Sequence, residues 1–160
     1  MDDREITSII STSWGNLEAV FKNHCLIFLG QSKEKRNILD DFSAKLENEM
    51  EEYFAGKRKI FTIAANPFGS KFETDIWEAC KKIPYGKTHT YKELSVASGH
   101  PKAFRACGNA LHKNPIPFII PCHRVLACNG IGGYGLGLDL KLKLLSLENP
   151  EIFSNLRQTS

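Results

Sequence analysis

A chain of 160 residues with 42% hydrophobic, 10% aromatic and 24% charged residues has the composition of a globular protein with one sizeable core or two small ones. No apolar run approaches the roughly 20 residues that cross a bilayer, and the acidic N-terminus differs from the basic start of a secretory signal. We therefore expect a cytoplasmic protein (nuclear if eukaryotic) with no membrane partner.

The net charge of +3 is unevenly distributed along the chain. Residues 1–79 carry ten Lys or Arg and fourteen Asp or Glu, whereas residues 80–160 carry eleven Lys or Arg and only four Asp or Glu. A basic second half suggests contact with a polyanion. From charge alone, an unevenly charged surface without a partner explains the pattern about as well.

The first 65 residues are predicted to form a small α/β domain. The stretches ITSIISTS, LEAVFKN and CLIFLG are apolar or alternating, which predicts three short strands with turn candidates at Gly15-Asn16 and Asn23-His24. Apolar residues then recur at helical spacing from Ile38 to Phe54, and Gly56 follows as a stop. The stretch KRKIFTIAA, residues 57–65, predicts one further strand.

Residues 66–160 are predicted to form a second, mostly helical domain. After the break at residues 66–69, Ser70 and Glu73 have the spacing of a capping box, which opens a helix that Pro84 and Gly86 end. A second capping box, formed by Thr90 and Glu93, starts the next helix, TYKELSVAS, which stops at Gly99.

Two short helices joined by a tight turn over residues 90–113 resemble a helix-turn-helix. Pro101 suits the first turn of the second helix, PKAFRACGNALHK, which is rich in small side chains that let its backbone approach another surface closely. That surface is either DNA or a neighbouring helix. Helix packing is the more common reason for small residues, and the basic charge of this half favours DNA.

The segment NPIPFIIPCHRV, residues 114–125, carries the candidate chemistry. Its three prolines exclude a regular helix and predict a rigid, largely buried turn and strand that holds Cys122 in one place. A thiol needs a base to become a thiolate at neutral pH. His123 is adjacent in sequence, but neighbouring side chains diverge, so a water bridge or an irregular backbone must connect the two. His123 also needs an orienting acid, and on these two residues alone a buried pair without chemistry is the commoner explanation.

The five cysteines are odd in number and include no C-x-x-C pair, which argues against a disulfide framework. A zinc site built from Cys122, His123 and Cys128 is conceivable, but its spacing fits no common pattern. We therefore expect no metal, and most of the cysteines are predicted to be small buried hydrophobes.

A glycine-rich loop, ACNGIGGYGLGLD, follows the candidate site. It lacks the G-K-[ST] sequence of a phosphate-binding P-loop, and its glycines allow the backbone to approach a ligand. The next stretch, LDLKLKLLSLE, alternates like a strand, but its good helix formers and lack of β-branched residues predict a helix. Asp139 is expected to cap it, and Pro150 to follow its end.

In these motifs the chain resembles the O6-alkylguanine-DNA alkyltransferases, the methylated-DNA–protein-cysteine methyltransferase family. The resemblance is carried by RACGNALHKNPIPFIIPCHRV, NGIGGYGLGL and KLKLLSLE, with support from EYFAGKRK and WEACKKIPYGKTHTYKEL. It is strong over residues 72–148 and weaker over residues 1–65. The implied fold is α+β: a small N-terminal domain with a ribonuclease-H-like sheet (1–65), then a mostly helical DNA-binding and catalytic domain with a winged helix-turn-helix (66–160).

The resemblance implies DNA repair by a single-turnover, irreversible transfer of an alkyl group from O6-alkylguanine to Cys122. The guanine is rotated out of double-stranded DNA bound through its minor groove, which suits damage in any sequence. A Glu148–His123–water–Cys122 relay activates the thiol, no cofactor or metal is needed, and a monomer is expected. The catalytic residues are Cys122, His123, Glu148, Asn114 and Tyr91. The DNA contacts are Arg105, which enters the base stack, with Ala103, Ala106, Gly108 and Tyr91. The pocket is lined by Val125, Tyr134 and Gly135.

Two departures from the family pattern bear on the pocket. The loop between Gly130 and Tyr134 is one residue shorter than the family pattern, and Gly135 stands where some members have Ser or Ala. Three other functions compete with the alkyltransferase hypothesis. The chief one is a non-catalytic protein that binds alkylguanine in DNA, a class that typically lacks the cysteine. The others are a Cys-His hydrolase and a helix-turn-helix regulator.

Overall fold

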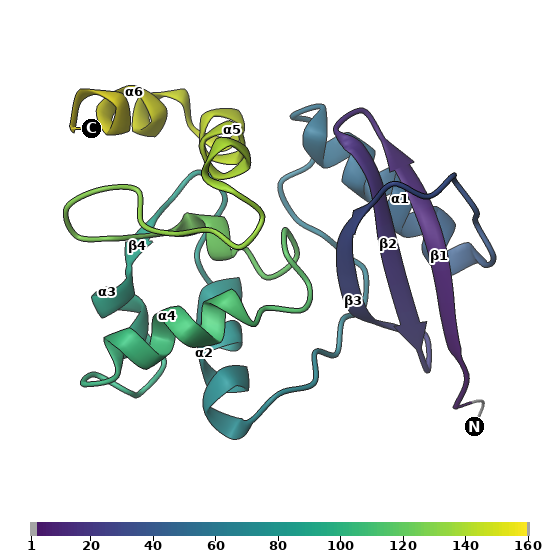
Figure 1. Cartoon of the computed structure of the whole chain (residues 1–160), viewed down its shortest axis with the longest axis horizontal. Helices are drawn as coiled ribbons and strands as arrows, with labels where there is room; N and C mark the ends of the chain where they lie inside the picture. Colours follow the sequence, from purple (N-terminus) through teal and green to yellow (C-terminus); the bar gives the residue numbers. More distant parts are fainter. Residues whose placement is uncertain (1–2, 160) are drawn as a thin grey trace. The chain divides into compact units, whose positions relative to one another are not determined.

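The computed structural model describes residues 3–159, which form two compact units (Figure 1). Of these residues, 3–68 and 115–119 make up the first, called here the sheet unit, and 69–114 and 120–159 make up the helical unit. The mixed α and β content, with a small sheet early in the chain and helices after it, is as predicted. Residues 115–119, shortly before Cys122, belong to the sheet unit, which the sequence pattern did not predict.

The three predicted strands form an antiparallel sheet in the order β1 (Glu5–Thr12), β2 (Gly15–Lys22) and β3 (Cys25–Ser32). The turn predicted at Asn23-His24 is confirmed, and both residues have positive φ angles of 50° and 65°, which suits the twist of a two-residue hairpin. The turn predicted at Gly15-Asn16 is wrong. These two residues already pair with β1, opposite Thr12 and Ser11, and the turn lies at residues 13–14.

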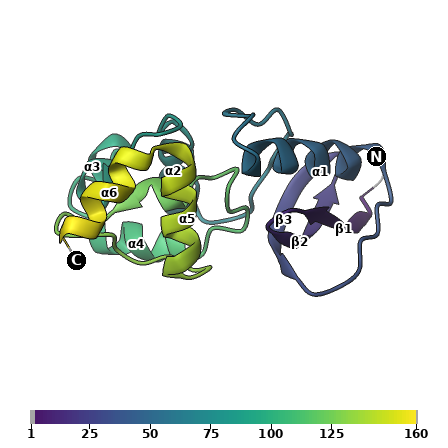
Figure 2. The same ribbon diagram turned by 90° about the horizontal axis from the view of Figure 1, so that it is seen from above.

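Helix α1 (Asp41–Phe54) lies along one face of this sheet (Figure 2). It begins three residues later than predicted, because the side chain of Asp40 accepts a hydrogen bond from the Ser43 backbone and caps the helix there. Its buried face includes Leu46, Met50 and Tyr53, each 0% exposed, and these residues form the core of the sheet unit with the inner face of the strands.

The strand predicted over residues 57–65 is wrong. Only Ala65 forms a β-bridge, to Leu26, and Ile60 is 74% exposed. The Thr62 backbone N–H and hydroxyl both donate to the buried carboxylate of Glu49 on α1. Because a side chain of α1 takes the hydrogen bond that a neighbouring strand would take, this segment runs as an irregular connection.

The helical unit contains α2 (Lys71–Lys81), α3 (Tyr91–Ala97), α4 (Phe104–His112), α5 (Leu138–Glu148) and α6 (Pro150–Thr159). Both predicted capping boxes are present, at Ser70/Glu73 and Thr90/Glu93, and they start α2 and α3 at the predicted places. Two-residue strands β4 (His89–Thr90) and β5 (Val125–Leu126) pair in parallel. Trp77 of α2 is buried and donates its indole N–H to the Ala110 carbonyl of α4, 2.9 Å away, which joins these two helices.

Two helix boundaries differ from the prediction. Pro101 lies in the turn before α4, and Ala103 precedes the helix without a side-chain hydrogen bond. Gly137, with a φ of 102°, occupies the position before α5, so Asp139 lies inside the first turn and does not cap it. Pro150 follows the end of α5 as predicted, and it also opens α6, a helix that the sequence pattern did not predict.

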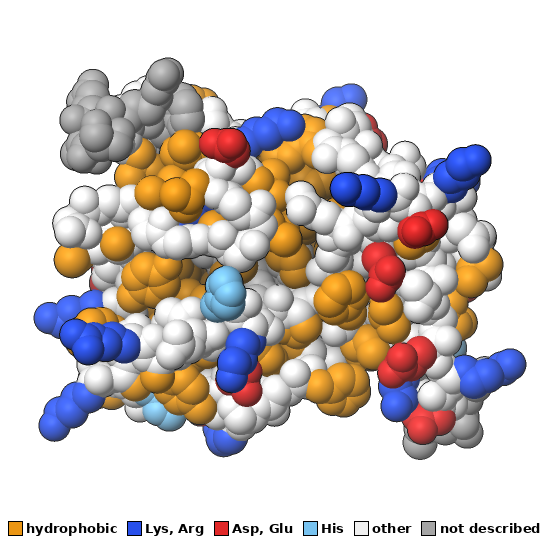
Figure 3. All heavy atoms as spheres, in the orientation of Figure 1, with side chains coloured by type: hydrophobic (Ala, Val, Ile, Leu, Met, Phe, Trp, Pro, Cys, Tyr) orange, Lys and Arg blue, Asp and Glu red, His pale blue; other side chains and the backbone are white. Residues whose placement is uncertain are grey.

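The surface of the helical unit is basic where α3 and α4 lie. On the face drawn in Figure 3, Lys and Arg side chains project from this region, with hydrophobic side chains between them. Within residues 3–159, no helix is long and apolar enough to cross a membrane.

Candidate active site

Cys122 begins a three-residue 3-10 turn, Cys122–Arg124, that runs directly into β5. Proline at position 121 cannot donate a backbone hydrogen bond, and the turn closes by the Arg124 N–H donating to the Pro121 carbonyl at 2.9 Å. The rigid turn and strand predicted here is confirmed, with the strand only two residues long. The turn places Cys122 on the surface of a cavity while His123 and Arg124 are buried behind it.

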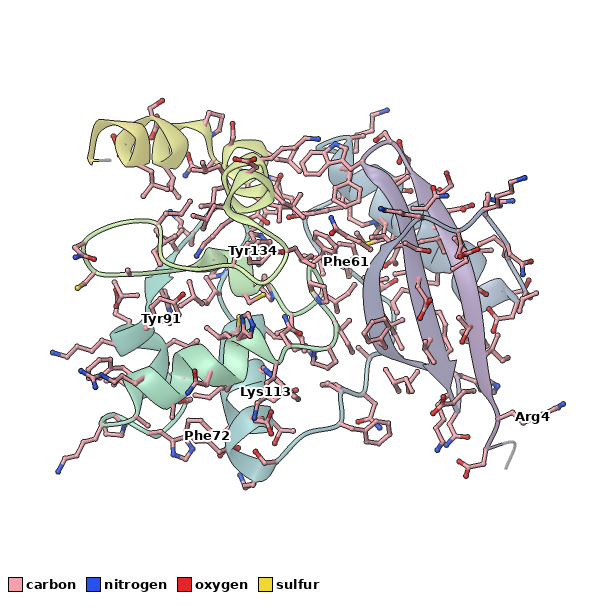
Figure 4. All side chains as sticks on the ribbon, in the orientation of Figure 1. Arg4, Phe61, Phe72, Tyr91, Lys113 and Tyr134 are labelled. Atoms are coloured by element: carbon pink, nitrogen blue, oxygen red, sulfur yellow. The ribbon has the colours of Figure 1, made fainter. Side chains whose placement is uncertain are left out.

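The cavity has a volume of about 80 Å3 and draws its walls from α3, α4, the cysteine turn and the loop before α5. Its lining residues are Tyr91, Gly108, Leu111, His112, Cys122, Gly133, Tyr134 and Gly135. Five of the residues predicted for the site are therefore together here, although 44 positions separate the first and last of them in the chain. Leu111, His112 and Gly133 were missed: leucine and glycine carry no chemical signature in sequence, and His112 is ten positions away from Cys122 in the chain. Tyr91 and Tyr134 can be followed in Figure 4.

Asn114 fixes the position of the thiol. Its side-chain N–H donates to Cys122 Sγ at 3.2 Å and to the Ile120 carbonyl at 2.9 Å. One amide therefore holds both the sulfur and the backbone two residues before it. Asn114 lies two residues after the last residue of α4 and is the first residue of the N-P-x-P sequence. Its hydrogen bonds therefore connect the end of α4 to the cysteine turn.

Behind Cys122, a buried ionic group orients the imidazole. His123 Nε2 lies 2.9 Å from Glu148 Oε1, and the His123 side chain is 0% exposed. Arg124 donates to the same carboxylate from Nε and from its terminal nitrogen at 2.8–3.2 Å, and also to the Ile83 carbonyl at 2.7 Å. Arg124 was not predicted to take part, although it belongs to the Cys-His-Arg motif.

The charges in this group are set by burial and hydrogen bonding together. Burial acts to raise the pKa of Glu148, but hydrogen bonds from His123 and Arg124 outweigh it and lower that pKa to about 2. Burial lowers the pKa of His123 and outweighs the opposing interaction with Glu148, so the imidazole is neutral at pH 7. With Glu148 ionised, Nε2 carries the proton, and Nδ1 is the basic nitrogen.

The thiol itself is protonated at rest. Burial raises the pKa of Cys122, and the hydrogen bond from Asn114 and the charge of Lys141 only partly oppose this. A protonated thiol beside a neutral, oriented imidazole can become a nucleophile only by losing its proton in the reaction. The acid that His123 needs for its orientation is Glu148, the residue that the resemblance implied.

Lys141 of α5 is a functional candidate that sequence reasoning missed. It is 0% exposed, and its ammonium group donates to the Val125 carbonyl at 2.7 Å and to the Gly133 carbonyl at 2.8 Å. Burial lowers its pKa to about 8, and interaction with Cys122 opposes the shift. The lysine links the strand after the cysteine turn to the loop that lines the cavity. Nothing in the alternating Leu-Lys sequence indicates that this lysine is buried, because lysine side chains usually lie at the surface.

The loop before α5 is packed closely against Tyr91. Gly132 has a φ of 73°, and a Cβ atom there would lie 3.0 Å from both Tyr91 Oη and the Ala127 nitrogen. Burial raises the pKa of Tyr91, and a hydrogen bond from the Gly133 backbone opposes it. Within residues 3–159, the hydroxyl of Tyr134 is buried without a hydrogen-bond partner. The cavity is therefore lined by two tyrosines, and one of them, Tyr91, is packed against the loop.

Other predicted site residues lie outside the cavity. Val125 is 0% exposed and is not among the residues that line the cavity; its carbonyl accepts a hydrogen bond from Lys141. Arg105 and Ala106 are exposed on α4, and Ala103 is partly exposed just before it. In the part of the chain that the structure describes, no group of three His, Cys, Asp or Glu side chains is arranged to hold a metal ion. Cys128, the third residue of the conceivable zinc site, is exposed.

Comparison with known proteins finds relatives of this chain. Residues 71–150 match the family described as 6-O-methylguanine DNA methyltransferase, DNA binding domain. A protein named methylated-DNA–protein-cysteine methyltransferase from Methanosarcina acetivorans is 46% identical over 110 residues, which are 68% of this chain and 70% of that protein.

Solved structures extend the likeness to both units. The crystal structure of the Mycobacterium tuberculosis O6-methylguanine methyltransferase is 30% identical, with a TM-score of 0.81 over 92% of this chain and 94% of that one. The structure of the Mycobacterium tuberculosis protein OGT in complex with DNA is 32% identical, with a TM-score of 0.81 over 90% and 92% of the two chains.

Proposed function

This chain belongs to the methylated-DNA–protein-cysteine methyltransferase family, and from that premise we propose that it repairs alkylated DNA by moving the alkyl group of O6-alkylguanine irreversibly to its own Cys122. The observation that carries the proposal is the arrangement behind the cavity: the thiol is held by Asn114, and the imidazole of His123 is oriented by Glu148.

The transfer is one displacement. The Cys122 thiol gives its proton through a water molecule to Nδ1 of His123, and Sγ attacks the alkyl carbon. The S–C bond forms while the C–O6 bond breaks, and the bonding electrons leave with guanine O6. The departing guanine anion accepts a hydrogen bond from Tyr91, which lines the same cavity. The thioether is stable, so each molecule reacts once.

Glu148 keeps the relay in the correct protonation state. Its carboxylate is held ionised by Arg124 and therefore fixes the Nε2–H tautomer of His123. The imidazolium that forms when His123 takes the thiol proton is then stabilised by the adjacent carboxylate. Asn114 stabilises the thiolate by donating to Sγ throughout.

DNA is proposed to bind through α4. In this proposal α3 and α4 form a winged helix-turn-helix, α4 is the recognition helix, and it lies in the minor groove of double-stranded DNA. Exposed Arg105 enters the base stack as the nucleotide rotates into the cavity, and small residues on α4 allow close approach. The DNA complex of the Mycobacterium tuberculosis relative supports DNA as the partner. The sheet unit is proposed to have a ribonuclease-H-like topology, and the protein to act as a monomer.

Intact-protein mass spectrometry with peptide mapping tests the proposal. After mixing with duplex DNA that contains O6-methylguanine, we expect one methyl group on Cys122, saturating at one per protein. The Cys122→Ala variant should still bind the alkylated duplex and accept no methyl group. Tight binding without transfer by the wild-type protein would indicate a damage-binding protein. Methylation of Cys128 in place of Cys122 would show that Cys128 is the nucleophile.

A further inference from the structure

Phe104 is a large apolar side chain left in solvent at the start of α4. It is the first residue of the helix, and it is 49% exposed. A single exposed apolar residue is common on protein surfaces and needs no explanation by itself. The position of this one relative to the cavity gives it significance.

Phe104 lies on the helix face that lines the cavity. Successive residues of an α-helix are rotated by about 100°, so Gly108, Leu111 and His112 point at about 40°, −20° and 80° from the direction of Phe104. The mean of these three directions is about 35° from Phe104 and about 65° from Arg105. All three residues line the cavity. Phe104 therefore lies about one helical turn, or about 6 Å along the helix axis, from Gly108. Its direction around the helix is closer to that of the cavity-lining residues than the direction of Arg105 is.

The chemistry around this ring favours a polyanion with flat apolar groups. Residues 94–138 contain no Asp or Glu, while Lys102, Arg105 and Lys113 contribute positive charge near the ends of α4. On the surface drawn in Figure 3, basic and hydrophobic side chains are interspersed over α3 and α4. An aromatic ring among cations is typical of surfaces that stack on nucleic-acid bases while neutralising phosphates.

We propose that Phe104 is a DNA-contacting wedge: its ring stacks against the nucleotide that neighbours the alkylated guanine, at the gap left when that guanine rotates into the Cys122 cavity. The inference rests on the proposed alkyl transfer from duplex DNA. Inserted apolar side chains of this kind unstack base steps in minor-groove complexes. Phe104 and Arg105 then act as a pair, one supplying apolar stacking and the other charge.

Single-turnover methyl transfer to the full-length protein tests the wedge on two substrates, a duplex containing O6-methylguanine and the free base O6-methylguanine. The Phe104→Ala variant should react at least about fivefold more slowly with limiting duplex, the lower bound for an aromatic–base stack. Its rate with the free base should equal that of wild type, because no stack is disturbed there. The Phe104→Trp variant should retain most of the duplex rate.

The matched control is Phe68→Ala, which removes a phenylalanine that is 63% exposed and belongs to the sheet unit. This variant should react normally with both substrates. A salt titration separates stacking from phosphate contact: Phe104→Ala should leave the slope of log affinity against log salt unchanged, whereas Lys102→Ala should reduce it.

A normal duplex rate for Phe104→Ala, or equal losses on duplex and free base, would overturn the wedge. So would failure of Trp to restore the duplex rate. Each of these results leaves the proposed function intact so long as wild type methylates Cys122. If wild type transfers no methyl group from either substrate, it is the proposed function that fails.

Discussion

His123 Nε2 and Glu148 Oε1 lie 2.9 Å apart in a site where both side chains are at most 1% exposed. The pair is separated by 25 positions in sequence, and it converts an otherwise unremarkable Cys-His dipeptide into an oriented base beside a nucleophile. Because burial keeps the pKa of His123 below its usual value, the base is ready to accept a proton at neutral pH.

The first prediction concerns this base. His123→Ala should slow single-turnover methyl transfer by about 100-fold or more, the usual contribution of a general base. Urea unfolding should show that the variant still folds cooperatively, and rapid-quench assays with labelled duplex measure the rate. An unchanged transfer rate would remove His123 from the mechanism.

The second prediction concerns stability and pH. The folded-state pKa of Glu148 is lowered to about 2 from an ordinary 4.5, so its ionised form stabilises the fold above pH 4.5, and this contribution is lost as the pH falls towards 2. Glu148→Gln should reduce the free energy of unfolding at pH 7 by on the order of 3 kcal/mol. The difference in the free energy of unfolding between this variant and wild type should become smaller as the pH falls from 4.5 to 2. Urea unfolding at several pH values checks this, with the exposed-acid variant Glu151→Gln expected to match wild type throughout.

The third prediction concerns Lys141. Lys141→Met leaves the Val125 and Gly133 carbonyls without their donor and removes a positive charge that lowers the pKa of the Cys122 thiol. At neutral pH a lysine with a pKa of about 8 is mostly protonated, so the variant should hold a smaller fraction of Cys122 as thiolate there. The rate of Cys122 alkylation by iodoacetamide, followed against pH, should be lower than that of wild type near pH 7, while the exposed-lysine variant Lys143→Met keeps the wild-type profile. Coincident profiles for Lys141→Met and wild type would contradict the electrostatic role.

The fourth prediction concerns base rotation. Arg105→Ala should slow transfer from duplex DNA by about tenfold, because extruding a paired nucleotide costs a few kcal/mol that the arginine helps to offset. Transfer from the free base should change little. Parallel assays on the two substrates make the comparison, and equal losses would rule out a role in rotation.

The fifth prediction concerns the loop before α5. In Gly132→Ala, the new methyl group would lie 3.0 Å from Tyr91 Oη, at a φ of 73° that costs a non-glycine residue about 1 kcal/mol. We expect lower stability, displacement of Tyr91 and slower transfer. Gly130→Ala is the matched control, since nothing lies within 4 Å of its added Cβ. Thermal unfolding and single-turnover assays distinguish the two variants, and equal behaviour would show that the loop does not brace Tyr91.

Much of the local structure could be predicted because it depends on neighbours a few residues away. The Ser70/Glu73 and Thr90/Glu93 capping boxes fixed where α2 and α3 start, since each satisfies helix-end donors within one turn. The predicted strand over residues 57–65 was wrong because its structure depends on a residue farther away in the chain. The Thr62 backbone N–H donates to the side chain of Glu49, on the preceding helix. Propensity alone could not anticipate that competition.

For the site, the candidate nucleophile, the adjacent imidazole and the small residues of α4 could be predicted from the sequence, because residue type and close spacing carry that information. The fold sets their surroundings. It buried Lys141 and Arg124, residues that sequence patterns place in solvent, and satisfied each with carbonyl or carboxylate acceptors. The physical reason is that charge in a protein interior is set by desolvation and by partners far along the chain, and only folding brings those partners together.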